Sequence, residues 1–352
     1  MRVAVTVDPY VPVPPRLYGG IERVADIVVR GLSERGHAVT LFAHPDSRTA
    51  GRLRPYGAPP HAGWRPRLTE LWQVGNVLWR RRQDFDVVFS WGRLAALLPI
   101  LPYRRLPKVQ RYCRNRVPWW SVRMAVRLAG SSIRFAGASS SLYDERPAQG
   151  KYGGRWCTVY DGVEISKYTF VPRVPRDAPV VFLGRIERVK GAHSAIAIAR
   201  AAGRKLIIAG NRSPNGEEAA YFEQAIAPQI DGDAVRYVGA VDDAQKNQLL
   251  GSAAALLFPI EWREAFGIVM AEAFACGTPV IGFRCGSVPE VIRDGVNGFV
   301  CRDVNEAVRA MADLDRIDRG AVRADCEARF SAKVLVDAVE GLLVEAVNAY
   351  EP

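Results

Sequence analysis

Two glutamates with seven residues between them stand in the stretch that offers the clearest chemistry, Pro259–Glu290. The stretch reads PIEWREAFGIVMAEAFACGTPVIGFRCGSVPE; Glu264 precedes an expected helix that begins near Gly267, and Glu272 lies inside that helix. The first amides of a helix have no partner within it and attract anions such as a diphosphate. Glycine leaves that approach open because it has no side chain. The two glutamates could therefore contact two parts of one extended ligand, although taken alone they are explained more simply as solvated carboxylates on a helix surface.

Two cations follow another expected strand. Arg185 and Lys190 lie in the segment GRIERVKG, directly after the apolar residues 180–183. Guanidinium and ammonium groups beside a helix N-terminus suit a diphosphate leaving group, and a solvated basic loop is the alternative explanation.

A pair of glycines opens the first expected helix of the N-terminal half. Gly19 and Gly20 could bring backbone amides near the phosphates of a ligand across an interdomain cleft. They do not form the G-x-G-x-x-G pattern, and no acidic residue follows at the expected distance. A nicotinamide-dependent dehydrogenase is therefore disfavoured.

Strands and helices alternate on both sides of one expected boundary, which is typical of α/β domains with parallel sheets. Pro172, Pro175 and Pro179 punctuate a charged stretch without periodicity. We therefore expect an N-terminal domain of residues 1–168 and a C-terminal domain of residues 169–352, whose last helix could pack back on the first domain. The expected strands are 2–7, 38–42, 86–90, 108–112, 135–139, 180–183, 205–209, 235–238, 254–258 and 280–283; the expected helices are 21–32, 192–202, 219–226, 244–252, 267–276, 304–314 and 332–347.

Positive charge is concentrated in one region of the chain. The 352 residues carry a net charge of +11, and residues 64–134 contain 15 Lys/Arg against 3 Asp/Glu, together with six of the eight tryptophans. Tryptophan next to arginine on an amphipathic surface suits the headgroup region of an anionic membrane, and a solvated basic face with tryptophans in the core is the alternative. The side chains concerned are Trp72, Trp79, Trp119 and Trp120 beside Arg80, Arg81, Arg82 and Arg116, and a helix face of Val122, Val126 and Ala129 edged by Arg123, Arg127 and Arg134.

Targeting segments and cysteine pairs are not evident in the sequence. No apolar run predicts a signal peptide or a membrane span. The six cysteines show no C-x-x-C pair and no zinc-like spacing, so we expect buried free thiols in a reducing cytoplasm.

Four segments spread over nearly the whole chain carry a family resemblance. They are YGGIERVADIVVRGLSERGHAVTLF, GRIERVKG, VGAVDDAQKNQLLGSA, and EAFGIVMAEAFACGTPVI followed by GSVPEVIRDGVNGF. With them, and with the paired glutamates, the sequence resembles the family-4 retaining glycosyltransferases, which include sucrose-phosphate and lipopolysaccharide glycosyltransferases. The resemblance implies the GT-B fold: two Rossmann-like α/β domains that face each other across a cleft, with the nucleotide-sugar donor on the C-terminal domain.

The resemblance also implies roles for individual residues. Glu264 would contact the donor sugar, Glu272 would bind the ribose hydroxyls, and Arg185 and Lys190 would hold the diphosphate. The other implied donor contacts are the amides of Phe266, Gly267 and Ile268, around the sugar and the distal phosphate, and the loops at Gly210-Asn211 and Val241-Asp242, which would frame the base.

Two departures from the family pattern stand out. In EAFG, Ala265 takes the place of the commoner proline, which costs some loop rigidity but no functional group. Many members carry a histidine just after the strand that corresponds to 108–112, where this chain reads VQRYCRN, and its histidines lie at 37, 44, 61 and 193. Arg114 and Asn115 are acceptor-side candidates by position only.

The resemblance implies an enzyme that moves a sugar from a nucleotide-diphosphate sugar to an acceptor hydroxyl with retained configuration. The expected acceptor is a glycan or a lipid-linked molecule of cell-envelope glycan, lipopolysaccharide or exopolysaccharide synthesis. We expect no cofactor, no nucleic-acid partner, and no metal at Asp84-Phe85-Asp86 or Asp313-Leu314-Asp315. The expected location is the cytoplasm, with peripheral attachment to the inner face of an anionic membrane as an option. A GT-B nucleotide-sugar epimerase and, from a different class, a basic polyanion-binding protein are the alternatives.

Overall fold

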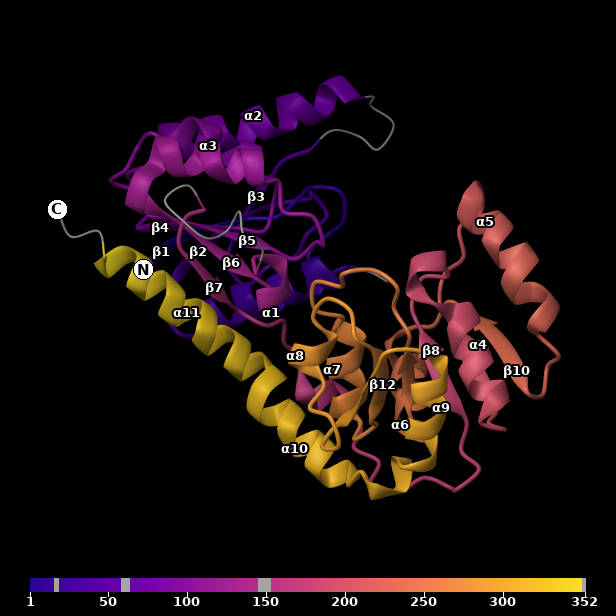
Figure 1. Cartoon of the computed structure of the whole chain (residues 1–352). Helices are drawn as coiled ribbons and strands as arrows, with labels where there is room; N and C mark the ends of the chain where they lie inside the picture. The colour runs from indigo at the N-terminus through magenta and orange to yellow at the C-terminus, as the bar shows by residue number, and fades with distance from the viewer. Residues whose placement is uncertain (16–18, 58–63, 145–152, 350–352) are drawn as a thin grey trace. The chain divides into compact units, whose positions relative to one another are not determined.

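The computed structural model describes residues 1–15, 19–57, 64–144 and 153–349 (Figure 1). The chain divides into two compact units, Met1–Asp161 with Ala332–Pro352, and Gly162–Ser331. The first segment thus ends at Asp161, whereas the sequence placed the domain boundary after residue 168. The last helix was assigned to the second domain with the option of packing back, and it belongs to the first unit because it packs against that unit's first helix.

Within the described residues, the first unit is built on a seven-stranded parallel sheet of order β3-β2-β1-β4-β5-β6-β7. In the middle of the sheet, Val5 pairs in register with Leu41 on one side and with Phe89 on the other, and all three are fully buried. Strands covered on both faces have continuous apolar sequences, which is why they could be predicted. The strands are β1 (Arg2–Thr6), β2 (Ala38–Ala43), β3 (Arg52–Pro55), β4 (Val87–Ser90), β5 (Lys108–Tyr112), β6 (Ile133–Gly137) and β7 (Trp156–Thr158).

The last helix of the chain packs on the first helix of this unit. A Cβ atom on Gly31 would lie 2.6 Å from a methyl group of Val336, so the close approach of the two helices requires a glycine. Arg35 adds ion pairs of 2.5 Å to Asp337 and Glu340. The helices of the unit are α1 (Gly20–Glu34), α2 (Trp64–Arg80), α3 (Trp119–Ala129) and α11 (Ala332–Asn348), with a 3-10 segment η1 (Leu94–Ile100).

Within the described residues, the second unit has a six-stranded parallel sheet of order β10-β9-β8-β11-β12-β13. Its neighbouring central strands β8 and β11 are the two that precede the expected donor-site loops, so their carboxyl ends bring those loops together. The strands are β8 (Val180–Leu183), β9 (Leu206–Ala209), β10 (Val235–Gly239), β11 (Leu256–Phe258), β12 (Val280–Phe283) and β13 (Gly298–Cys301); the helices are α4 (Ala192–Ala201), α5 (Glu217–Tyr221), α6 (Asp243–Ser252), α7 (Ile268–Ala275), α8 (Val288–Val291), α9 (Val304–Ala312) and α10 (Arg319–Phe330).

Sequence patterns missed the elements that lack a clear apolar period, namely β3, β7, β13, α2, α8 and α10. The expected position of Arg134 on the edge of an amphipathic helix is wrong. The helix α3 ends at Ala129, and Gly130 follows in the left-handed region with φ +61°. Arg134 instead lies on β6, where it is buried and pairs with Glu345 of α11 at 2.5 Å.

No helix in the described part of the chain is both long and apolar enough to cross a membrane. All six cysteines are free thiols; Cys276, Cys301 and Cys326 are buried as expected, whereas the other three are only partly buried.

Candidate functional site

Glu264 is held in the loop that connects β11 to α7. Its side chain is 15% exposed, and its Oε2 atom accepts hydrogen bonds from Lys190 Nζ at 2.5 Å and Trp262 Nε1 at 3.1 Å. Gly286, with φ +56°, approaches so closely that a Cβ atom would lie 2.4 Å from backbone atoms of Glu264. The Ser287 amide donates to the Glu264 carbonyl at 3.0 Å. These contacts with the loop after β12 fix the Glu264 loop although it lacks the family's proline.

The helix α7 begins directly after this loop. Gly267 caps it in a left-handed conformation, φ 78° and ψ 66°, which side chains other than glycine rarely adopt. Phe266 is buried against Phe330, with ring centroids 5.4 Å apart, and its carbonyl accepts a hydrogen bond from Ser287 Oγ at 2.9 Å. The Met270 amide donates to the Gly267 carbonyl at 2.9 Å, and the amides of Ile268 and Val269 lie at the open N-terminal end of the helix. The helix therefore offers the anion-binding end that the sequence predicts, beside Glu264.

The loop between β8 and α4 supplies the cations. Gly191, with φ +77°, lies so close to the loop after β11 that a Cβ atom would be 2.0 Å from the Pro259 carbonyl oxygen. This approach seats Lys190 Nζ over the Trp262 ring, 4.7 Å from its centroid, and against Glu264. Arg185 pairs with the carboxylate of Glu187. The structure thus brings Lys190 to Glu264, and each of the two cations has a carboxylate partner.

Glu272 is buried, with 4% of its surface exposed, so the interpretation as a solvated helix-surface carboxylate is wrong for this residue. Its Oε1 atom accepts hydrogen bonds from Tyr168 Oη at 2.8 Å and Lys246 Nζ at 2.6 Å. No donor among the described residues reaches Oε2. Lys246 also lies 3.3 Å from Asp243. One carboxylate oxygen is therefore fixed by the protein and the other remains available to a ligand.

Sequence reasoning missed Lys246 and Tyr168. Lys246 lies inside VGAVDDAQKNQLLGSA, so the resemblance contained a signal for it. Tyr168 stands in the irregular stretch near the expected boundary, where no pattern pointed to a role. Lys246 reaches Glu272 because the helices α6 and α7 pack together, and Tyr168 reaches it from the segment that follows residues 165–167.

The loops expected to frame a nucleotide base have clear structural roles. A Cβ atom on Gly210 would lie 1.7 Å from the Gly184 carbonyl oxygen, and the neighbouring Asn211 is exposed. Val241 is partly buried, and Asp242 caps α6 by accepting a hydrogen bond from the Gln245 amide at 2.8 Å. Base contacts by these residues stay a prediction.

The first unit has its own polar cluster at the carboxyl ends of its central strands. Asp8, just beyond β1, is 8% exposed and accepts hydrogen bonds from the Arg93 amide at 3.1 Å and from Arg114 Nη2 at 3.4 Å. Burial raises the pKa of the nearby Glu22 carboxyl, and the Arg114 charge opposes that shift. Gly19 caps α1, where a Cβ atom would lie 2.9 Å from the Glu22 carboxylate. Arg114 therefore joins a charged cluster with Asp8 and Glu22. The sequence analysis did not predict these two acids, although the position of Asp8 just after the first strand could have indicated it.

Buried polar atoms adjoin this cluster. Thr6, Ser90 and Gln110 pair in register across β1, β4 and β5, so their side chains share one face of the sheet. Among the described residues, Thr6 Oγ1, Ser90 Oγ and Gln110 Oε1 are buried without a hydrogen-bond partner. Such atoms are rare in native proteins and point to a place where polar groups of a ligand or solvent bind. Asn115, the other acceptor-side candidate, makes no side-chain hydrogen bond in the described part of the chain.

Among the described residues, no group of three His, Cys, Asp or Glu side chains could hold a metal ion. In the first Asp-x-Asp triplet, Asp86 pairs with Arg2 at 2.7 Å; in the second, Asp313 pairs with Arg316 at 3.0 Å. His61 lies outside the described residues. The remaining histidines make local contacts: His37 with Glu340, His44 with the Asp46 amide, and His193 with Tyr221 and Glu261.

Comparison with known proteins identifies both units. Residues 169–317 match the family of glycosyl transferases group 1, and residues 18–127 match glycosyltransferase family 4. A glycogen synthase of Mycobacterium tuberculosis (strain CDC 1551 / Oshkosh) is 32% identical over 167 residues, which cover 44% of this chain and 39% of that protein. The match thus spans about two fifths of that relative's length.

Solved structures with the same fold cover nearly the whole chain. Sucrose-phosphate synthase from Thermosynechococcus elongatus has a TM-score of 0.81 at 18% identity, over 99% of this chain and 100% of that one. The Anabaena HepE protein, solved in complex with UDP and glucose, has a TM-score of 0.74 at 19% identity, over 98% and 99% of the two chains. The chain thus has two parallel-sheet Rossmann-like units and shares the GT-B fold of these structures, and its residues 18–127 and 169–317 are similar to glycosyltransferase family 4 and to glycosyl transferases group 1.

Proposed function

We propose that the protein is a retaining glycosyltransferase that moves a sugar from a nucleotide-diphosphate sugar to an acceptor hydroxyl. The observation that carries this proposal is the pair of carboxylates around the start of α7. Glu264 accepts a hydrogen bond from Lys190, and Glu272 is buried with one carboxylate oxygen held by Tyr168 and Lys246. The HepE protein, whose fold is similar, was solved with UDP and glucose, which supports a donor of this class.

The charges of the second unit suit a diphosphate that leaves as an anion. Lys190 and the N-terminus of α7 would stabilise the negative charge that develops on the leaving phosphate, with Arg185 as the second cation. Lys190 has three N–H donors, so it can keep Glu264 and still bind a phosphate oxygen. Arg185 would have to share its guanidinium between Glu187 and the phosphate.

In the transfer, the bond between the sugar C1 atom and the distal phosphate oxygen breaks, and a bond from C1 to the acceptor oxygen forms. The family resemblance implies that the departing phosphate oxygen takes the proton of the acceptor hydroxyl. No carboxylate of the protein is then needed as a nucleophile, and no metal is needed to neutralise the leaving group. Glu264 serves to position the donor sugar.

The first unit offers the acceptor side. Asp8 and Glu22 can accept hydrogen bonds from sugar hydroxyls, and Arg114 can donate to them. Asp8 is held by the Arg93 amide at 3.1 Å, which keeps its carboxylate fixed at the end of β1. We assign to this cluster the positioning role that a histidine plays in many family members.

A lipid-linked or envelope-glycan acceptor fits the surface of the first unit. Trp72 of α2 and Trp120 of α3 are 66% and 74% exposed, which is unusual for such large apolar side chains. Both helices pack on η1, so they lie on one side of the unit (Figure 1). Together they form the tryptophan-arginine face: Trp72, Trp79, Leu98, Trp120 and Leu128, with the exposed Arg80, Arg81, Arg104, Arg105, Arg123 and Arg127.

This face supports a peripheral enzyme on the cytoplasmic side of an anionic membrane. Co-sedimentation with anionic and with neutral liposomes tests the idea at low and high salt. Binding should need anionic lipid, fall as salt rises, and weaken when Arg80, Arg81 and Arg82 are changed together to Ser. A protein that ignores anionic liposomes at low salt would leave a soluble acceptor as the better proposal.

The transfer itself is tested in two steps. A thermal-shift panel of UDP-, GDP-, ADP- and dTDP-sugars should reveal one nucleotide class that raises the melting temperature. The stabilising donor is then incubated with candidate acceptors, and the anomeric configuration of the product is read by NMR. Turnover of the donor without any acceptor would favour the epimerase, and binding of polyanions without any nucleotide-sugar would favour a polyanion-binding protein.

A further inference from the structure

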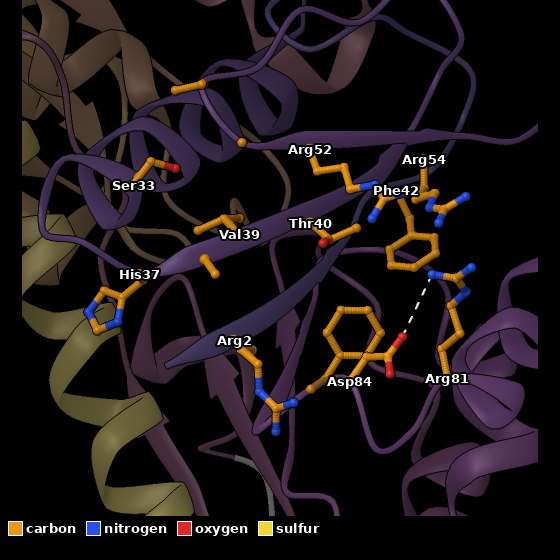
Figure 2. Close-up of a pocket in the computed structure, with 14 residues that line it drawn as sticks. Arg2, Ser33, His37, Val39, Thr40, Phe42, Arg52, Arg54, Arg81 and Asp84 are labelled. Carbon is orange, nitrogen blue, oxygen red and sulfur yellow. Dashed lines mark ion pairs between the residues drawn. The ribbon is translucent and has the colours of Figure 1, made fainter.

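A cavity of about 550 Å³ opens beside the edge of the first unit's sheet (Figure 2). Thr40 and Phe42 of β2 line it and pair in register with Arg52 and Arg54 of β3. Residues paired in register at alternate positions project to one face, so both arginines border the same hollow. The strand β3 is the outermost strand of the sheet, which leaves its arginine side chains accessible.

Positive charge in this cavity is not balanced by the protein. Four arginines line it, and one of them, Arg2, is neutralised by an ion pair of 2.7 Å with Asp86. The other three, Arg52, Arg54 and Arg81, share a single carboxylate of the lining, Asp84, which lies 3.7 Å from Arg81. In the described part of the chain, Arg52 and Arg54 have neither an ion pair nor a side-chain hydrogen bond. The positive charge of Arg52, followed by that of Arg81, lowers the pKa of Arg54. Figure 2 shows the three groups gathered around Phe42.

The cavity does not include the acceptor-side cluster. Its lining runs along β2 and β3 at the edge of the sheet and reaches the amino ends of β1 and β4 at Arg2 and Asp84, and neither Asp8 nor Arg114 is part of it. Reactive sites of parallel sheets lie at the carboxyl ends, where Asp8 and Arg114 are found. The cavity is therefore not a part of the acceptor cluster.

We propose that this cavity is a second ligand site, which binds a phosphate monoester through Arg52, Arg54 and Arg81. Three guanidinium groups with one carboxylate leave an excess of two positive charges, which matches the charge of about −1.5 to −2 on a monoester at neutral pH. Guanidinium forks suit phosphate oxygens better than ammonium groups do. The monoester group can come from a soluble sugar phosphate or from a lipid headgroup.

The matched test compares two double variants of equal charge change. Arg52→Ser/Arg54→Ser alters the cavity, and Arg173→Ser/Arg236→Ser removes two exposed arginines from the second unit. Titration calorimetry with glucose 6-phosphate should show binding to the wild type. The control variant should keep the same Kd, and the cavity variant should raise the Kd by about tenfold or more. Arg52→Lys/Arg54→Lys should retain part of it, because the charge remains while the forks are lost.

A second arm identifies the source of the phosphate. Vesicles that contain phosphatidic acid, a monoester, are compared with phosphatidylglycerol vesicles of equal surface charge. A preference for phosphatidic acid that disappears in the cavity variant assigns the site to a lipid; calorimetric binding without such a preference assigns it to a soluble ligand. If the cavity and control variants behave alike in both arms, while melting curves show both folded, the proposal is overturned.

Discussion

Replacing Glu272 tests the donor site most directly, because the structure separates its two oxygens. Oε1 is held by Tyr168 at 2.8 Å and Lys246 at 2.6 Å, and we propose that Oε2 binds the donor ribose. A hydrogen bond to a charged group contributes about 1.5–3 kcal/mol. Glu272→Ala should therefore raise the Kd for the donor nucleotide by about 10- to 150-fold. Isothermal titration with the nucleotide identified by the thermal-shift panel measures this change.

The fold should survive this substitution. Lys246 loses Glu272 but keeps Asp243 at 3.3 Å, so no buried cation is left without a partner. The matched control is Asp325→Asn, since Asp325 is equally buried in the same unit and accepts from Arg293 at 2.7 Å and Asn297 at 2.8 Å. The control should lower the melting temperature without changing donor affinity. If Glu272→Ala is folded and binds the nucleotide as tightly as the wild type, the role assigned to this carboxylate is wrong.

Three further outcomes are expected. Glu264→Ala should lower kcat by about tenfold or more, while the affinity for the nucleotide stays equal or rises because Lys190 is released to the diphosphate. Steady-state kinetics and nucleotide titration measure the two quantities, and a large loss of nucleotide affinity would contradict the prediction. Burial lowers the pKa of Lys108 from 10.5 to about 7, so between those values the unfolded chain binds a proton that the folded protein lacks, and stability rises with pH. From pH 7 to 8.5 the free energy of unfolding should increase by about 1.5 kcal/mol more in the wild type than in Lys108→Met, measured by urea unfolding, and parallel pH profiles would refute the assignment. Transfer activity should persist in excess EDTA, and a complete loss restored only by Mg²⁺ or Mn²⁺ would show that a metal is required.

Local patterns predicted the elements that surround the site. The strands at 180–183 and 280–283 have the observed bounds, because fully buried parallel strands are continuous apolar runs. The strand at 108–112 also has the observed bounds, although it buries Lys108, Gln110 and Arg111. The start of α7 followed from Gly267, which the structure places in a left-handed cap. By contrast, β3 was missed because an edge strand that alternates arginines with other residues has no apolar run to reveal it.

The sequence by itself determined the parallel α/β class, the segments that match glycosyltransferases, and the pair of glutamates with seven residues between them. Tertiary structure decided which of those residues are buried and which side chains they contact. Burial of Glu272 depends on Tyr168, which lies 104 positions earlier in the chain, and the charge of Lys190 is met by Glu264, 74 positions later. It also decided that Arg134 is internal and that Arg52 and Arg54 border a cavity. Periodicity reports which face of an element is apolar, whereas partners distant in the chain are chosen by strand order and helix packing, which no local pattern contains.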